Sequence, residues 1–332
     1  MTEPQTPTVI HLSTPGDVLE AVPFLLGYVP TDKLVVLGLS GRRVRLTQSQ
    51  ALAGPGAPDE GDKEACRALA RRLVAQHLEA GSSELILVVY SEVSRVALAG
   101  MLALAADAAG LPVRDLVAVA GGRFACASGA ASGPVPLTGT SAALLEVGGR
   151  LPMGRDAIVA EVAACGFAGD DAQEFQRALA QGRERVRGDR HALTAELLAW
   201  VAEGMPSAAA VGTAILGDGA SEPTPHEAGL YLAALEVHGI RDLALTLLVA
   251  PQVRVACTAR LAALARRAPG ELAAAPLTLW ALAAYLGGDG MRAQIGLVRA
   301  LTVAPGYLLA RAMLGALQAG LPPEPLADMV RQ

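Results

Sequence analysis

The residues best suited to chemistry follow the most apolar segment of the chain, residues 84–90. Tyr90, Ser91 and Glu92 stand at the end of this segment, where ligands collect in layered α/β domains. Ser91 has the side chain of a nucleophile, or of a group that binds an anion at the start of the following helix. The alternative is a plain N-cap, which is favoured because no Gly-x-Ser-x-Gly elbow surrounds Ser91.

A second candidate is the pair Gly121-Gly122 with the arginine that follows it, Arg123. A guanidinium on a flexible turn facing the same end of the sheet suits a carboxylate or a phosphate. The alternative, which the pattern favours, is a two-residue hairpin turn followed by an exposed arginine. Arg123 is still the best single candidate for binding an anion. Arg150 and Arg155 either close over the same strand ends or, by the favoured interpretation, cover a domain junction.

The remaining polar residues form no catalytic or metal-binding motif. The five histidines lack metal-ligand spacing, and His77 is expected to be exposed on a helix among arginines. The four cysteines form no Cys-x-x-Cys pair, so burial as small apolar side chains explains them better than zinc or disulfides do. We therefore expect no metal site, and whether the protein binds a cofactor stays unknown. The cysteines are Cys66, Cys126, Cys165 and Cys257.

Strand and helix patterns alternate over the first 126 residues, which predicts a three-layer α/β domain with a mixed sheet. The run 84–90 is expected at the centre of the sheet, with helices on both faces. Segment 42–47 has its charges on one side and is expected at or near a sheet edge. The predicted strands are 34–39, 42–47, 84–90, 113–120 and 123–126, and the predicted helices between them are 63–80 and 92–109.

A helix and a turn precede the first strand and are expected to act as a structural clamp. Ser13 is placed to cap the helix, and Pro23 is expected to kink it or end it early. Gly27 suits a left-handed C-cap, and Pro30 prevents the helix from resuming. The helix is therefore expected to meet the first strand through a fixed bend.

The clamp also resembles the opening motif of an actinobacterial family catalogued as domain of unknown function 4192. The matching residues of the clamp include Pro23, Leu26, Gly27, Tyr28 and Pro30, and further matches lie at 87–90, 122–124, 151–155, 288–290 and 304–310. The resemblance covers most of the chain and implies no activity. Residues 45–48 replace an arginine-aspartate-leucine-proline-like run, and Cys126 alone remains of a cysteine-rich segment. These departures leave open whether the chain keeps any chemistry of its relatives.

Beyond the α/β part, every periodic stretch is helical, and two segments are expected to be flexible. Residues 127–136 have the composition of a linker or flap, and 204–222 that of a second connection. The predicted helices are 141–147, 155–165, 172–186, 191–202 and 225–237. The expected parts are an α/β domain at 1–137, a helical connecting region at 138–253 and a helical-hairpin repeat region at 254–332.

The prediction of a repeat region rests on an internal similarity of the sequence. Residues 261–272 recur 36 residues later as 297–308, each with an Ala-Pro-Gly turn. The spacing of small and large residues around these turns predicts stacked helical hairpins and partly matches a tetratricopeptide repeat.

Charge and hydropathy narrow the classes of partner. A net charge of −5 argues against a general electrostatic grip on nucleic acid. Residues 1–12 lack the pattern of a secretory signal. The uncharged window 124–145 is rich in glycine, serine and proline, and the uncharged window 272–288 is rich in alanine and contains Pro276. Neither composition is typical of a membrane span. We expect a cytoplasmic protein with no membrane partner.

Two functions from different classes fit these patterns. The repeat and the lack of a catalytic constellation favour an adaptor or regulatory protein whose helical region binds a protein partner. The alternative is a small-molecule enzyme or sensor, with an anionic ligand between the strand ends and the flap and with Arg123 as its anchor. The sequence leaves it open whether the protein is an enzyme.

Overall fold

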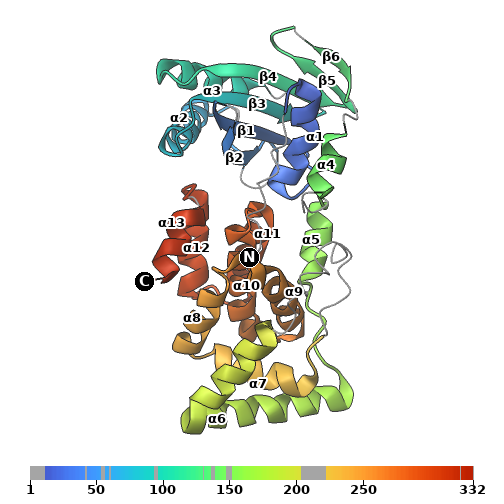
Figure 1. Ribbon diagram of the computed structural model, residues 1–332, viewed down its shortest axis with the longest axis vertical. Helices are drawn as coiled ribbons and strands as arrows, with labels where there is room; N and C mark the ends of the chain where they lie inside the picture. Colours follow the sequence, from blue (N-terminus) through green and yellow to red (C-terminus); the bar gives the residue numbers. More distant parts are fainter. Residues whose placement is uncertain are drawn as a thin grey trace, which may run out of the picture. The chain divides into compact units, whose positions relative to one another are not determined.

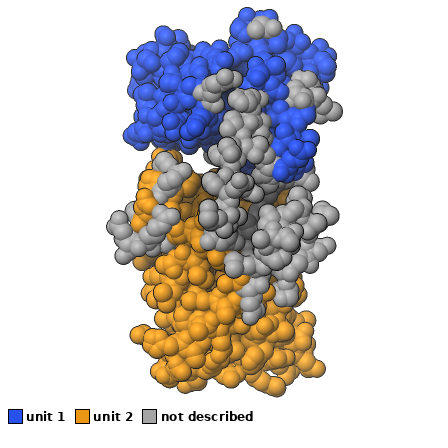
Figure 2. Space-filling model, viewed as in Figure 1, with its two compact units in different colours: residues 1–152 blue, residues 153–332 orange. Residues whose placement is uncertain are grey.

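The computed structural model of the chain divides into two units, residues 1–152 and residues 153–332 (Figures 1 and 2). Within the described residues, the strands lie in the first unit, and the second unit is helical. This confirms the predicted fold class, an α/β domain with a mixed sheet followed by a helical region. The described residues are 12–41, 43–53, 57–59, 61–92, 96–129, 131–135, 139–146, 152–202, 222–321 and 323–331.

The sheet of the first unit has the strand order β2-β1-β3-β4-β5-β6. β3 and β4 run parallel with α3 between them in the chain, and the other neighbouring pairs run antiparallel. β2 lies at one edge, as its outward arginines predict, and β3 lies inside the sheet. The strands are β1 (Lys33–Ser40), β2 (Arg43–Ala51), β3 (Glu84–Tyr90), β4 (Val113–Ala120), β5 (Arg123–Cys126) and β6 (Ser132–Pro134).

Helices cover both faces of the sheet. On one face α2 and α3 bury the side chains of Leu34 and Val36 in a shared aliphatic cluster. Val35 points to the opposite face, and so does its cross-strand partner Ser49. The Tyr28 hydroxyl, just after α1, donates to Ser49 Oγ at 2.8 Å, so α1 ends on that opposite face. The helices are α1 (Pro15–Leu26), α2 (Lys63–Glu79), α3 (Ala97–Ala108) and α4 (Thr140–Glu146).

The N-terminal clamp forms, with two differences from the prediction. Thr14, not Ser13, caps α1: its hydroxyl accepts from the Asp17 amide at 3.2 Å, and the Asp17 carboxylate accepts from the Thr14 amide at 2.8 Å. Pro23 lies inside α1 without ending it. The helix stops at Gly27, whose φ of 77° is the expected left-handed C-cap.

Two segments after β3 differ from the sequence-based expectation. α3 begins at Ala97 rather than near residue 92, and residues 93–95 lie outside the described part. The predicted flap includes a strand, β6, which pairs with β5 through Ala125 and Ser132. Its sequence Ser-Gly-Pro has little strand propensity, so only pairing with β5 reveals it, and an edge position tolerates its proline.

In the second unit α10 is the central helix. Its residues from Ala274 to Ala284 are all buried, and it contacts α7, α8, α9, α11, α12 and α13. The uncharged window 272–288 is therefore a core helix. The helices are α5 (Arg155–Glu161), α6 (Gly169–Ala202), α7 (Pro225–Leu235), α8 (His238–Leu247), α9 (Pro251–Arg267), the short 3₁₀ helix η1 (Gly270–Ala273), α10 (Ala274–Leu286), α11 (Gly290–Val303), α12 (Leu308–Gln318) and α13 (Pro323–Arg331).

The two helices expected at 172–186 and 191–202 form one element, α6, with a kink at Asp189. Asp189 has φ −134° and ψ 77°, and its carboxylate accepts from the Ala192 amide at 3.2 Å. It therefore acts as an N-cap for the second half, which explains why the sequence reads as two helices.

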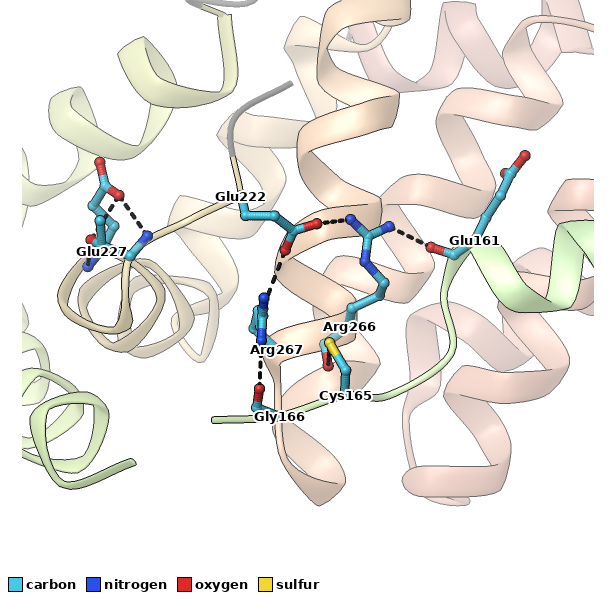
Figure 3. Close-up of polar contacts among 8 residues, drawn as sticks. Glu161, Cys165, Gly166, Glu222, Glu227, Arg266 and Arg267 are labelled. Atoms are coloured by element: carbon cyan, nitrogen blue, oxygen red, sulfur yellow. Dashed lines mark hydrogen bonds and ion pairs between the residues drawn. The ribbon is translucent and has the colours of Figure 1, made fainter. Parts of the chain in front are cut away.

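The C-terminal end of α9 holds two connecting segments of the chain (Figure 3). Arg266 donates from its guanidinium to the Glu161 carbonyl at 2.7 Å, and its own carbonyl accepts from the Cys165 amide at 2.9 Å. The Glu222 carboxylate pairs with both Arg266 and Arg267. These contacts fix the segment after α5 and the segment before α7 to one helix end. Of the predicted connection 204–222, only Glu222 belongs to the described residues.

The two copies of the internal repeat occupy comparable places. Residues 261–272 cover the end of α9 and most of η1, and 297–308 cover the end of α11 and the turn before α12. Each copy is thus a helix end with the turn that follows it. The tetratricopeptide-like arrangement of these helices stays a prediction.

Candidate functional site

A serine and an aspartate meet where β3 ends. Ser91 Oγ donates to Asp32 Oδ1 at 2.8 Å. Because β1 runs antiparallel to β3, Asp32, which immediately precedes β1, lies beside the residue that follows β3. Asp32 has φ 48°, a left-handed conformation that is strained for a residue other than glycine. A carboxylate in this position holds the serine hydroxyl in one orientation.

Ser91 does not cap α3, so the favoured N-cap interpretation is wrong. The N-cap of α3 is Val96, which makes no capping hydrogen bond through its side chain. The Ser91 amide instead donates to the Val119 carbonyl at 3.1 Å and extends the pairing of β3 with β4.

The glycine pair after β4 forms the two-residue hairpin turn that its sequence predicts. Gly121 and Gly122 have φ of 54° and 68°, and Ala120 pairs with Arg123 across the turn. The Gly121 amide donates to Glu92 Oε1 at 2.9 Å, which ties the turn to the end of β3. Arg123 is exposed at the start of β5. Its role as an anion anchor stays a prediction.

Tyr90 is the last residue of β3 and contributes a buried hydroxyl. No described residue bonds to that hydroxyl, and burial raises the pKa of Tyr90. A buried hydroxyl without a partner costs free energy and is available to a ligand. We call the set Asp32, Tyr90, Ser91, Gly121, Gly122 and Arg123 the strand rim.

Arg155 lies in the second unit, as the exposed first residue of α5. Its predicted closure over the strand rim stays a prediction, and Arg150 lies outside the described residues.

The residues of the family motif are buried or belong to α1 and its C-cap, as expected for a structural role. Leu26, Tyr28 and Pro30 are buried, Pro23 lies within α1, and Gly27 caps it. Burial raises the pKa of Tyr28, although its bond to Ser49 acts in the opposite direction. These surroundings support the interpretation of the motif as a clamp.

His77 is buried, which overturns its expected exposure. Its side chain is 0% exposed, and neither ring nitrogen has a hydrogen-bond partner among the described residues. Burial lowers the pKa of His77 to about 4. The imidazole fits beside Gly38, the one residue without a side chain in β1. This glycine is the feature of the sequence that could have indicated a buried side chain next to the strand.

An apolar groove in the helical unit was not predicted. It has a volume of about 440 Å³ and lies between α8, α12 and α13. Leu243 is 49% exposed there. The amphipathic patterns of residues 238–247 and 308–318 are the features of the sequence that could have indicated the groove. The groove, called the α8–α12 groove below, is lined by Gly239, Asp242, Leu243, Leu245, Thr246, Leu309, Met313 and Leu326.

The described residues hold neither a cluster for a metal ion nor a membrane-spanning helix. No group of three or more histidine, cysteine, aspartate or glutamate side chains there is arranged to hold a metal ion. No helix in this part of the chain is both long and apolar enough to cross a membrane. All four cysteines are free, with Cys165 exposed and the other three buried.

The fold and these sites define a two-part protein, a mixed-sheet α/β unit followed by a helical unit. The sequence profile of the family described as Domain of unknown function (DUF4192) matches residues 15–324. The chain therefore belongs to this family, and the resemblance of its motifs is confirmed. The comparisons found no match among curated proteins and none among solved structures.

Proposed function

We propose that this protein is an adaptor or regulatory protein whose helical unit binds a partner protein. The observation that carries the proposal is the α8–α12 groove. Leu243, Leu309 and Met313 line it, and Leu243 remains half exposed to solvent. Apolar surface gathered in a groove is typical of a protein-binding site.

The occupant that fits the groove is an amphipathic helix from another protein. Such a helix buries an apolar stripe, and the flexible thioether of Met313 is able to adapt to it. Asp242 is the charged residue among the described lining residues, and its side chain is 57% exposed. Arg241 holds its carboxylate in place at 2.6 Å. Because this ion pair compensates the carboxylate, the apolar lining of the groove carries the recognition of the partner helix.

The test requires point variants of the whole chain. Removing residues 254–332 would delete α10, the core helix of the unit, so loss of binding would then report unfolding. Leu243→Glu places a charge in the groove without disturbing the core. Val298→Glu on α11 is the matched control, because Val298 is 47% exposed and lies outside the groove.

The partner is first captured by a photo-crosslinking residue at position 243 in native cells, with position 298 as the reference. Its affinity for both purified variants is then measured by calorimetry. We expect Leu243→Glu to weaken binding at least about tenfold, since a buried leucine contributes roughly 1.5–3 kcal/mol, and Val298→Glu to change nothing. Identical crosslinks at both positions, or equal affinities of the two variants, would overturn the proposal.

A second candidate function is a small-molecule enzyme or sensor that binds an anion at the strand rim. The strained backbone of Asp32 and its bond to Ser91 support it, because strain of this kind clusters at functional sites. Arg123 would supply the positive charge.

The test of this candidate is a thermal-shift panel of nucleotides, sugar phosphates and carboxylates. A ligand at about 100 times its dissociation constant adds roughly 2.7 kcal/mol of stability. The shift should disappear in Arg123→Ala and persist in Arg114→Ala, at the opposite end of β4. A panel without any shift, or a shift that survives Arg123→Ala, would exclude this site.

A further inference from the structure

The helical unit contains a second hollow, separate from the α8–α12 groove. It is a pocket of about 450 Å³ formed by α6, α7, α8, η1, α10 and the turn before α12. Its apolar lining includes Leu232, Leu235 and Ala275, whose side chains are 1%, 2% and 7% exposed. The volume falls within the range of small-molecule sites. The polar lining residues are Arg183, Glu236, His238, Glu271 and Tyr307.

Two of these charges neutralise each other. Arg183 donates from Nε and from a terminal nitrogen to the two carboxylate oxygens of Glu236, each at 2.8 Å. This fork geometry uses both oxygens of the carboxylate. An anionic ligand would therefore have to displace Glu236 to reach the guanidinium.

Glu271 is the charge that stays uncompensated. It lies at the exposed start of η1, and no described residue forms a hydrogen bond or an ion pair with its carboxylate. Tyr307 adds no charge, and its hydroxyl accepts a hydrogen bond from Arg241 at 3.4 Å. Among the acidic and arginine side chains that line the pocket, Glu271 is therefore the one whose charge no described residue compensates, and it lies above an apolar floor.

We infer that this pocket, the Glu271 pocket, binds a small organic cation: an ammonium group carried on a short apolar body. The apolar body covers Leu232, Leu235 and Ala275, and the ammonium group pairs with Glu271 at the mouth. The same surface disfavours a carboxylate, because its one free charge is negative. The inference does not depend on partner docking, since the lining residues of the Glu271 pocket and of the α8–α12 groove are different.

The test uses hexylammonium as the probe and hexanoate as the probe of equal length and opposite charge. Binding to the full chain is followed by ligand-observed NMR titration at low ionic strength, where the charge of Glu271 is least screened. Glu271→Gln removes the charge and keeps the shape. Glu174→Gln is the matched control, an exposed glutamate of α6 outside the pocket.

We expect hexylammonium to bind and hexanoate to bind at least about threefold more weakly, since the exposed carboxylate of Glu271 attracts the ammonium group and repels the carboxylate. Glu271→Gln should weaken hexylammonium binding about two- to fivefold, the range of an exposed ion pair, and Glu174→Gln and Leu243→Glu should leave it unchanged. Absence of hexylammonium binding, equal binding of both probes, or full binding by Glu271→Gln would overturn the inference. Because Leu243→Glu affects only the groove, failure here leaves the docking proposal standing.

Discussion

His77 Nδ1 lies where a side chain at position 38 would begin, because a Cβ on Gly38 would be 2.3 Å from that nitrogen. The same Cβ would lie 2.2 Å from Ser82 Oγ. Large aliphatic side chains, Leu34 and Val36, fill this face of β1 elsewhere. A single glycine in the strand therefore makes room for a buried imidazole from α2.

Gly38→Ala should destabilise the first unit. The new methyl group forces the imidazole and the serine hydroxyl to move inside a packed core, which costs about 1–3 kcal/mol. Urea unfolding followed by circular dichroism measures the change. Gly100→Ala in α3 is the control, since a Cβ there meets no atom within 4 Å, and it should be neutral or stabilising by up to about 1 kcal/mol. A Gly38→Ala protein of unchanged stability would show that the two neighbours move aside freely.

Stability should fall as the pH drops from neutral towards 4. Burial lowers the pKa of His77 to about 4, whereas an imidazole in the unfolded chain titrates near about 6.5. Between these values the unfolded chain binds more protons, so this contribution is intact above about pH 6.5 and is lost as the pH falls. From pH 7.5 to pH 5, His77 should account for a loss of about 2 kcal/mol.

His77→Leu should remove that part of the pH dependence, measured by urea unfolding at both pH values. His226→Gln, a change at an exposed histidine of α7, should leave the dependence as in the parent protein. An equal slope in the parent protein and in His77→Leu would contradict the assignment.

Gly229→Ala should separate α7 from α6. A Cβ at Gly229 would lie 2.6 Å from Ala178 Cβ and 2.7 Å from the Leu179 amide nitrogen, and the backbone cannot yield as a side chain can. We expect a loss of about 2 kcal/mol or more, seen as a lower Tm. Gly188→Ala in α6, where a Cβ meets no atom within 4 Å, should not lower the Tm. Similar Tm values for both variants would show that the two helices are not in close contact.

Arg292→Met should be far more damaging than Arg187→Met. The Arg292 side chain is 8% exposed and binds the carboxylates of Glu161 and Asp289, so its loss leaves two partly buried charges without their cation. We expect a cost of about 3 kcal/mol. Arg187 and its partner Glu184 are both 72% exposed, and breaking that pair should cost less than about 1 kcal/mol.

The measurement for both arginine variants is chemical denaturation at low and high salt. Burial alone would lower the pKa of Arg292, but Glu161 and Asp289 outweigh it and the pKa is raised, so the charge persists at any working pH. Its effect should therefore be insensitive to salt, whereas the exposed pair is screened. Equal costs for the two variants would contradict the burial of Arg292.

Local patterns were sufficient for most of the fold. The bounds predicted for β3 and β4 match the observed strands, because the apolar run of β3 and the glycines on either side of β4 are properties of neighbouring residues. The left-handed C-cap at Gly27 and the turn at Gly121 follow equally from residue type. β6 was missed, since its three residues have strand geometry only through pairing with β5.

The candidate sites were predicted less completely. The sequence indicated Ser91 but not its partner Asp32, since the two meet only through the antiparallel pairing of β1 with β3. The α8–α12 groove is lined by side chains from α8, α12 and α13, and no local sequence pattern indicates that these helices are neighbours.

The sequence by itself determined the family, the order of an α/β part before a helical part, and the turns that glycine and proline impose. The tertiary structure alone decided which polar residues are buried, as for His77, and which apolar residues remain exposed to solvent, as for Leu243. The physical reason is that helix and turn formation depend on neighbours along the chain. Burial and hydrogen-bond pairing depend on segments that are distant in sequence and meet only in the folded state.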